Sequence, residues 1–140
     1  MNTSEKTSKR LTKALGILQL FIGIGAIGGG SALILDPNGS NLGVPLEMLE
    51  HSPFSDFLIP GIVLLLVNGI GSIVGCVYSF RLNQYAAEMA LGLGTFLVSW
   101  IIIQVYWIQG FHWLHTLYLG IGIIEVILGW LLQKALNASK

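Results

Sequence analysis

Glu125 is the residue most suited to chemistry, because its carboxyl group lies near the middle of an apolar stretch that runs from about Trp113 to Leu132. A charge at that depth in a membrane costs on the order of 2.5 to 3.5 kcal/mol, so the carboxyl group should be neutral or partnered. Counting depth along antiparallel helices places Asn68 and Ser99 at a similar level. We therefore predict an intramembrane polar cluster made of Glu125, Asn68, Ser99, Thr95 and Gln19.

Two interpretations of this cluster stay open. Intramembrane acids mark proton relays and substrate sites, which would make Glu125 part of a proton-coupled small transporter or channel subunit. Alternatively, Glu125 and Asn68 hold helices together through interhelical hydrogen bonds of about 1 kcal/mol each. Both interpretations require the carboxyl group to face the interior of a helix bundle.

A second group of side chains, Trp100, Gln104 and Trp107, forms one face of the third apolar stretch. A glutamine between tryptophans can contact a ring-bearing ligand such as a quinone. The alternative is that the rings face lipid and that Gln104 bonds to a neighbouring helix. We keep this face as a candidate ligand-binding surface.

The histidines are weak candidates for a metal site. His112 and His115 could converge with His51, Glu50 or Glu47, and imidazole with carboxylate suits zinc. The HxxH spacing is common, however, and interfacial histidines without a ligand role or histidines that sense pH are the alternatives. We predict no metal site and no cofactor.

No catalytic residue is predicted from the sequence. It contains no recognisable Ser/His/Asp set, phosphate-binding loop or pair of catalytic carboxylates. The single cysteine, Cys76, excludes an intrachain disulfide, a CxxC redox pair and a thiolate metal cluster. A membrane enzyme or redox component is therefore the least supported class of function.

The composition is that of a membrane protein. Of 140 residues, 54% are apolar and only 10% are charged, whereas about a quarter of the residues are charged in soluble domains. The formal net charge of zero offers no basic surface for nucleic acid. The lipid bilayer is the partner that the composition indicates.

The apolar stretches predict four spans of about 20 residues, which is the length needed to cross a bilayer. We place them at about 14–35, 57–80, 85–108 and 113–132, within a single membrane domain of residues 14–133. Residues 1–13 and 134–140 are predicted to be cytoplasmic tails, the first of them flexible. The predicted fold is all-α, an antiparallel four-helix transmembrane bundle with an ordered extracytoplasmic loop between the first two helices.

That loop, residues 36–61, is the only long polar interruption in the apolar chain. Pro45 before Leu46 to Glu50 predicts a short surface helix. Ser52 followed by Pro53, with Asp56 in the first turn, predicts the start of the second span. Pro60 should add little more than a bend.

Basic residues set the orientation. They are Lys6, Lys9, Arg10, Lys13, Arg81, Lys134 and Lys140, and all seven fall on one side of a four-span arrangement. Both termini are therefore predicted to be cytoplasmic, in a multi-pass membrane protein. So strong a bias disfavours a pair of oppositely inserted copies and leaves a parallel homo-oligomer open.

Each predicted span has one face of small or polar residues, at alternating intervals of three and four. Helices in lipid associate through close approach at small residues and through interhelical hydrogen bonds, so these faces should meet in the interior. The faces are Gly16, Gln19, Gly23, Ala26 and Gly30; then Gly61, Leu65, Asn68, Ser72, Gly75 and Ser79; then Glu88, Gly92, Thr95 and Ser99; and finally His115, Tyr118, Gly122, Glu125 and Gly129.

With its DPNGSNLGVPLEMLEHSPFSDFLIPG loop, Asn68-Gly69 and the WIIIQVYWI run, the chain resembles a group of small four-span bacterial membrane proteins with a DP-G turn and an SPF-PG span start. That resemblance covers most of residues 14–132 and implies no particular activity. In size and topology the chain also looks distantly like the DoxX-like four-helix membrane proteins. This second likeness implies a prokaryotic cytoplasmic membrane and association with other envelope components.

Taken together, these features favour a non-enzymatic integral membrane protein that binds a lipid-like ligand or another membrane protein. Proton-coupled transport through Glu125 is the first alternative, and a membrane enzyme or redox component is the second.

Overall fold

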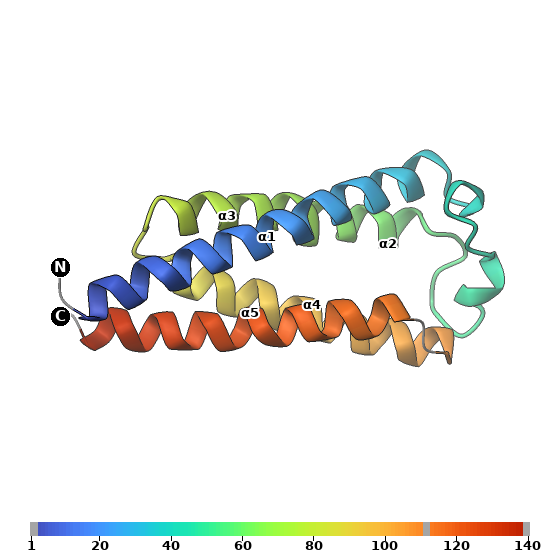
Figure 1. Cartoon of the computed structure of the whole chain (residues 1–140). Coiled ribbons are helices and arrows are strands. Elements are labelled where there is room, and N and C mark those ends of the chain that lie inside the picture. The colour runs from blue at the N-terminus through green and yellow to red at the C-terminus, as the bar shows by residue number, and fades with distance from the viewer. Residues whose placement is uncertain (1–2, 111–112, 139–140) are drawn as a thin grey trace.

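The computed structural model describes residues 3–110 and 113–138, and these residues form helices joined by short connections (Figure 1). The elements are α1 (Thr3–Leu35), the 3-10 helices η1 (Ser40–Leu42) and η2 (Leu46–Leu49), α2 (Leu58–Val63), the π-helix η3 (Leu64–Gly71), α3 (Ser72–Phe80), α4 (Ala86–Ile108) and α5 (Trp113–Ala138). With α2, η3 and α3 forming one rod, four helices are long and apolar enough to cross a membrane. The prediction of an all-α protein with four candidate spans is confirmed.

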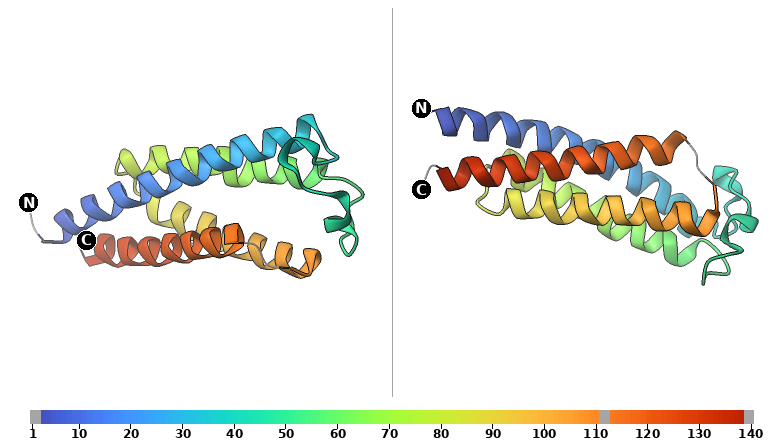
Figure 2. Two further views of the ribbon diagram at one scale, coloured as in Figure 1. Left: turned by 45° about the vertical axis from the view of Figure 1, so that its right-hand side comes forward. Right: turned by 90° about the horizontal axis from the view of Figure 1, so that it is seen from below.

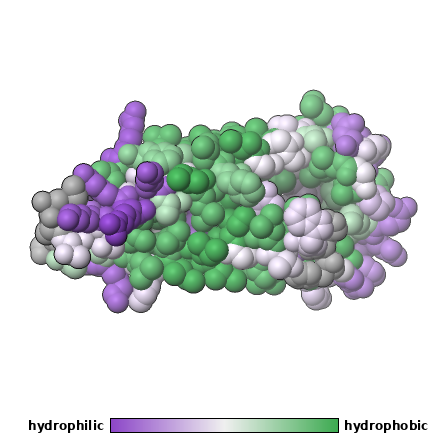
Figure 3. Space-filling view, in the orientation of Figure 1, coloured by the Kyte–Doolittle hydropathy of each residue, from purple (hydrophilic) through white to green (hydrophobic). Residues whose placement is uncertain are grey.

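The four rods run in alternating directions, so the start of α1 and the end of α5 lie at one end of the bundle (Figures 1 and 2). The loop between α1 and α2 covers the other end. Helix α1 packs against the α2–η3–α3 rod on one side and against α5 on the other, while α4 packs most extensively on α5. Apolar side chains form a belt between two polar ends, as expected for lipid contact (Figure 3).

Helix α1 begins well before the expected start of the first span. Residues 3–13, predicted as a flexible tail, are helical from Thr3. The reason is that the buried face continues: Leu11 packs against the core around Leu15 and Leu132, and Thr12 is 4% exposed. Helix α5 likewise continues to Ala138, beyond the expected end at Leu132.

The second rod is not a continuous α-helix. Between α2 and α3 the backbone runs as a π-helix from Leu64 to Gly71. The sequence analysis expects only a bend at Pro60, whereas the larger departure lies farther along the rod. Because π-helical turns are rare and are frequently found at functional sites, η3 directs attention to the residues that it carries.

The loop is ordered, but its second half differs from the expected helix start. Ser52 does not cap a helix: its hydroxyl group donates to the Leu49 carbonyl group at 2.8 Å and closes a turn. The rod begins at Leu58, whose N–H donates to Asp56 Oδ1 at 3.0 Å. The expected short helix after Pro45 is present as the 3-10 helix η2.

The interior faces predicted for the first two spans are buried, apart from partly exposed Leu65. In the fourth span Gly122, Glu125 and Gly129 are buried as predicted, while His115 and Tyr118 are half-buried. The prediction for the third span was wrong, because Glu88, Gly92, Thr95 and Ser99 are exposed. The buried residues of α4 are Ala86, Ala87, Ala90, Gly94, Leu97 and Ile101.

Small size, not polarity, selects the buried face of α4. A Cβ atom on Gly94 would lie 3.0 Å from the Gly122 carbonyl oxygen, and one on Gly129 would lie 3.0 Å from Ala90 Cβ. These close approaches let α4 and α5 pack along much of their length.

The contact between α1 and the second rod gives a test of close packing at small residues. A Cβ atom on Gly30 would lie 2.8 Å from the Leu65 backbone nitrogen, whereas one on Gly28 would meet nothing within 4 Å. We expect Gly30→Ala to lower the free energy of unfolding by about 1 to 3 kcal/mol, because the backbones must separate. Gly28→Ala should be neutral or stabilising by up to about 1 kcal/mol, since alanine is the better helix former. Unfolding in mixed detergent micelles measures both, and equal effects would contradict the contact.

Candidate functional site

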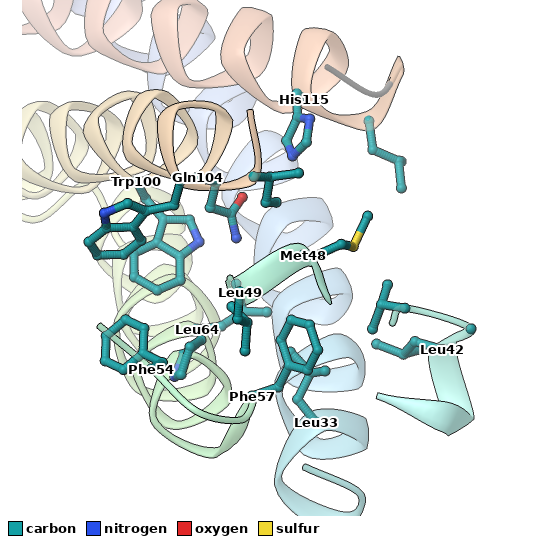
Figure 4. Close-up of a pocket in the computed structure, with 16 residues that line it drawn as sticks. Leu33, Leu42, Met48, Leu49, Phe54, Phe57, Leu64, Trp100, Gln104 and His115 are labelled. Carbon is teal, nitrogen blue, oxygen red and sulfur yellow. The ribbon is translucent and has the colours of Figure 1, made fainter. Parts of the chain in front are cut away.

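A cavity of about 450 Å³ lies beneath the loop and is called the outer cavity here. Leu33 of α1, together with Leu49 and Phe57 of the loop, forms one wall, and all three are buried. The opposite wall carries Trp100 and Gln104 of α4, with His115 of α5 beside them (Figure 4). Trp107 of α4 lines the cavity as well. The three residues predicted from the sequence as a ligand face therefore line the same cavity.

A second cavity of about 320 Å³, the inner cavity, extends toward the middle of the bundle. It lies between α1, η3, α4 and α5, and its wall includes Ala26, Asn68, Leu97 and Tyr118. The two cavities share five lining residues, namely Leu64, Trp100, Gln104, Leu114 and His115. They are therefore adjoining parts of one space that leads from the loop into the bundle.

Aromatic contacts hold the wall of the outer cavity in place. Phe54 of the loop meets Trp107 edge to face, with ring centroids 5.5 Å apart. Trp100 stacks on Phe96 at 6.1 Å. Because the Phe54–Trp107 contact joins the loop to α4, the loop is part of the binding site as well as its cover.

Three polar side chains contribute to a lining that is otherwise mostly apolar. Gln104 and His115 lie where the two cavities join, and Asn68 lies in the inner cavity alone. Asn68 is 2% exposed, and its Nδ2 atom donates to no group in the described part of the chain. A mostly apolar cavity with a few convergent polar groups is typical of a small-molecule site.

Glu125 belongs to a separate, closed cluster. The Ser79 hydroxyl group donates to Gln19 Oε1 at 2.8 Å, and the Gln19 side chain in turn approaches the Glu125 carboxyl group. Neither Gln19 Nε2 nor the carboxyl oxygens make a hydrogen bond of standard geometry. All three side chains are fully buried, and Glu125 lines neither cavity.

The predicted polar cluster is thus only partly assembled. Glu125 and Gln19 come together, with Ser79 as a third member that the sequence placed on the interior face but not in the cluster. Asn68 lines the inner cavity instead, and Thr95 and Ser99 are exposed on the outer side of α4. Depth counting placed Asn68 level with Glu125. Gln19, which approaches Glu125, instead lies beside Gly75 of α3.

The weak metal candidates are dispersed. His115 lines both cavities, whereas Glu50 and His51 are exposed in the loop, and His112 lies outside the described residues. Within residues 3–110 and 113–138, no three His, Cys, Asp or Glu side chains come together in a way that could hold a metal ion.

Sequence reasoning missed the contribution of the loop to the cavity wall. Phe54, Phe57 and Leu49 lie in a polar segment, where apolar side chains show no helical period. The sequence around Pro45 and Pro53 predicts two helix starts. Several apolar side chains within a polar loop are, however, themselves a sign that the loop packs against the bundle.

Comparisons with protein-family models, with curated proteins and with solved structures gave no match for this chain. The resemblance to small four-span bacterial membrane proteins, and the more distant one to the DoxX-like group, therefore stay predictions.

The Ser79–Gln19 bond predicts a difference between two serines. Ser79→Ala removes the donor from Gln19 Oε1 in a dry interior and should lower the free energy of unfolding by about 1 kcal/mol. Ser99→Ala is the matched control, because Ser99 is exposed, and it should change stability by less than about 0.5 kcal/mol. Unfolding of both variants in detergent micelles tests this, and a loss at Ser99 as large as that at Ser79 would refute it.

Proposed function

We propose that this protein is a non-enzymatic integral membrane protein that binds a lipid-like molecule in the outer and inner cavities. The observation that carries the proposal is the adjoining pair of cavities, about 450 Å³ and 320 Å³, whose shared wall includes Trp100, Gln104 and His115. Volumes of this size are usual for small-molecule sites. The mostly apolar lining matches a ligand that is already dissolved in the bilayer.

The chemistry of the lining favours binding over catalysis. Among the described residues that line the two cavities there is no Asp, Glu, Lys, Arg, Ser, Thr or Cys. A nucleophile or a general acid and base pair would therefore have to come from His115, Tyr118 and amide side chains alone. Rings and aliphatic side chains can hold an apolar molecule without changing it.

Proton-coupled transport receives less support from the same geometry. A proton relay needs a path by which the carboxyl group exchanges protons with water or substrate. Glu125 is fully buried and lines neither cavity, and its approach to Gln19 suits a contact that joins α1 to α5.

The orientation that we propose places the loop outside the cell and the described basic residues inside. Those residues are Lys6, Lys9, Arg10, Lys13, Arg81 and Lys134, and all lie toward the end of the bundle where α1 begins and α5 ends. An excess of Lys and Arg on short connections marks the cytoplasmic side. The outer cavity would then lie near the extracytoplasmic face of the membrane.

A membrane partner remains part of the proposal. The exposed side of α4 carries Gly92, Thr95 and Ser99, which are the small and polar residues that favour contact between membrane helices. A parallel homo-oligomer or a second membrane protein could use this side without blocking the cavities.

Ligand binding can be tested by filling the inner cavity. A Cβ atom on Gly29 makes an ordinary 3.6 Å contact with Leu64, so Gly29→Leu places its side chain in the cavity without a backbone clash. In nanodiscs, 1-bromoundecane should quench tryptophan fluorescence in a Trp113→Phe, Trp130→Phe background that keeps Trp100 and Trp107. We expect Gly29→Leu to weaken the affinity for the probe, as measured by this quenching, about tenfold, which corresponds to about 1.4 kcal/mol.

Gly28→Leu is the matched control, since Gly28 is exposed and a Cβ atom on it would meet nothing within 4 Å. The probe should quench the tryptophan fluorescence of this variant as strongly as that of the protein with Gly28 and Gly29 unchanged. Identical quenching in both leucine variants would mean that the probe reaches the tryptophans only from surrounding lipid or from the outer cavity, and binding in the inner cavity would be refuted.

The orientation predicts which cysteines an impermeant reagent reaches. In a Cys76→Ser background, we expect Ser55→Cys in the exposed loop to react with a membrane-impermeant maleimide in intact cells. Gln84→Cys, in the exposed α3–α4 connection, should react only after lysis. The reverse pattern, or reaction of both positions in intact cells, would overturn the orientation.

A further inference from the structure

Asn68 is a buried hydrogen-bond donor without a protein partner among the described residues. Its side chain is 2% exposed, and its Nδ2 atom donates to no protein group among the described residues. Most buried polar groups are paired, and each exception needs an explanation, such as a bound molecule. Asn68 lines the inner cavity, so whatever occupies that cavity is within its reach.

The π-helix η3 is the local structure that presents Asn68. Asn68 lies within the segment Leu64–Gly71, and Leu64 and Asn68 both line the inner cavity. The next residue, Gly69, faces α1, because a Cβ atom on it would lie 2.9 Å from the Ile27 side chain. The π-helical turn therefore packs one residue against α1 while its neighbour borders the cavity. π-Helical segments within α-helices are frequently found at functional sites.

The surroundings of Asn68 define the chemistry of its partner. No Asp, Glu, Lys or Arg side chain is among the described residues that line either cavity. A carboxylate or phosphate buried there would lose its hydration without gaining a cation. An amide N–H in an apolar cavity is best satisfied by a neutral acceptor, and carbonyl oxygen is the commonest such acceptor on membrane-soluble molecules.

We propose that the inner cavity selects a neutral, elongated, apolar molecule that carries a carbonyl group, and that Asn68 Nδ2 donates a hydrogen bond to that carbonyl oxygen. This inference rests on the proposed function, because it names the ligand class of the same cavities. The acyl ester of a lipid and the ring ketone of an isoprenoid-type molecule both supply this chemistry.

The test compares two probes that differ only in the carbonyl group, 11-bromo-2-undecanone and 1-bromoundecane. The protein keeps Trp100 and Trp107 as its only tryptophans and is held in nanodiscs. Quenching measured with the added Gly29→Leu substitution, which obstructs the inner cavity, gives the contribution of probe in lipid and in the outer cavity and is subtracted as a baseline.

We expect the wild-type cavity to bind the ketone more tightly than the alkane. Asn68→Leu, which is close in shape but has no donor, should weaken ketone binding about 2- to 10-fold, the effect of one hydrogen bond. Alkane binding should be unchanged. Thr95→Val is the control, because it replaces a polar side chain by one of the same shape on the exposed side of α4.

The outcomes separate this inference from the proposed function. Equal binding of both probes to the wild type overturns the inference and leaves ligand binding intact, and it needs no variant that has to fold. A ketone preference that survives Asn68→Leu overturns the assignment to Asn68. Binding of neither probe above the Gly29→Leu baseline overturns binding in the inner cavity, and with it the proposed function.

Competition then identifies the source of the carbonyl group. Unlabelled methyl decanoate represents the acyl ester, and 4-decylcyclohexanone represents the ring ketone. Displacement of the bromoketone by either one supports the inference and names the class. Displacement by undecane but by neither carbonyl compound overturns it.

Discussion

Close approach of backbones at small residues is the constraint on which this fold depends. Lipid removes most of the hydrophobic drive that would hold soluble helices together, so contact must come from packing and from a few hydrogen bonds. Gly30 meets Gly61 and Leu65, while Gly94 meets Gly122. These contacts bring α1 against the second rod and α4 against α5. The cavities lie between those two pairs, under the loop.

The loop turns this arrangement into a site. Gly39 has a φ of +80°, and a Cβ atom on it would clash with the Val44 carbonyl oxygen, so no larger residue fits. The turn allows Phe57 N–H to donate to the Pro37 carbonyl oxygen at 2.9 Å, which ties the two ends of the loop together. Phe54, Phe57 and Leu49 can then pack inward. Polar composition and apolar packing coexist because only a few side chains of the loop face the bundle.

Much of the fold could be predicted from the sequence, and the reasons for the failures are physical. Span length and composition gave the four helices, and the spacing of small residues identified the interior faces of the first two rods. For α4 the same spacing misled, because Thr95 and Ser99 are also tolerated on the outside of a membrane helix. Polarity there costs little when a hydroxyl group can bond back to its own helix. The alanines and Gly94, which do the packing, carry no polar signal.

The candidate site was predictable on its α4 side alone. Trp100, Gln104 and Trp107 are related by helical period, whereas their counterparts in the loop depend on how the loop folds. The partner of Glu125 depends on the register between helices, and no local pattern in the sequence specifies that register. The π-helix likewise leaves no trace in composition, since Leu64 to Gly71 reads as an ordinary apolar segment.

That π-helical segment has a consequence for how the chain tolerates changes in length. A π-helical turn accommodates one residue more than an α-helical turn, so deletion of one residue between Leu64 and Gly71 would let the rod continue as a regular helix. The span would survive such a deletion, yet every side chain on one side of the deletion would rotate by about 100° relative to the other, which is the angle between successive residues of an α-helix. Deleting one residue in this segment should therefore have little effect on membrane insertion, but it would change the direction in which the Asn68 side chain points.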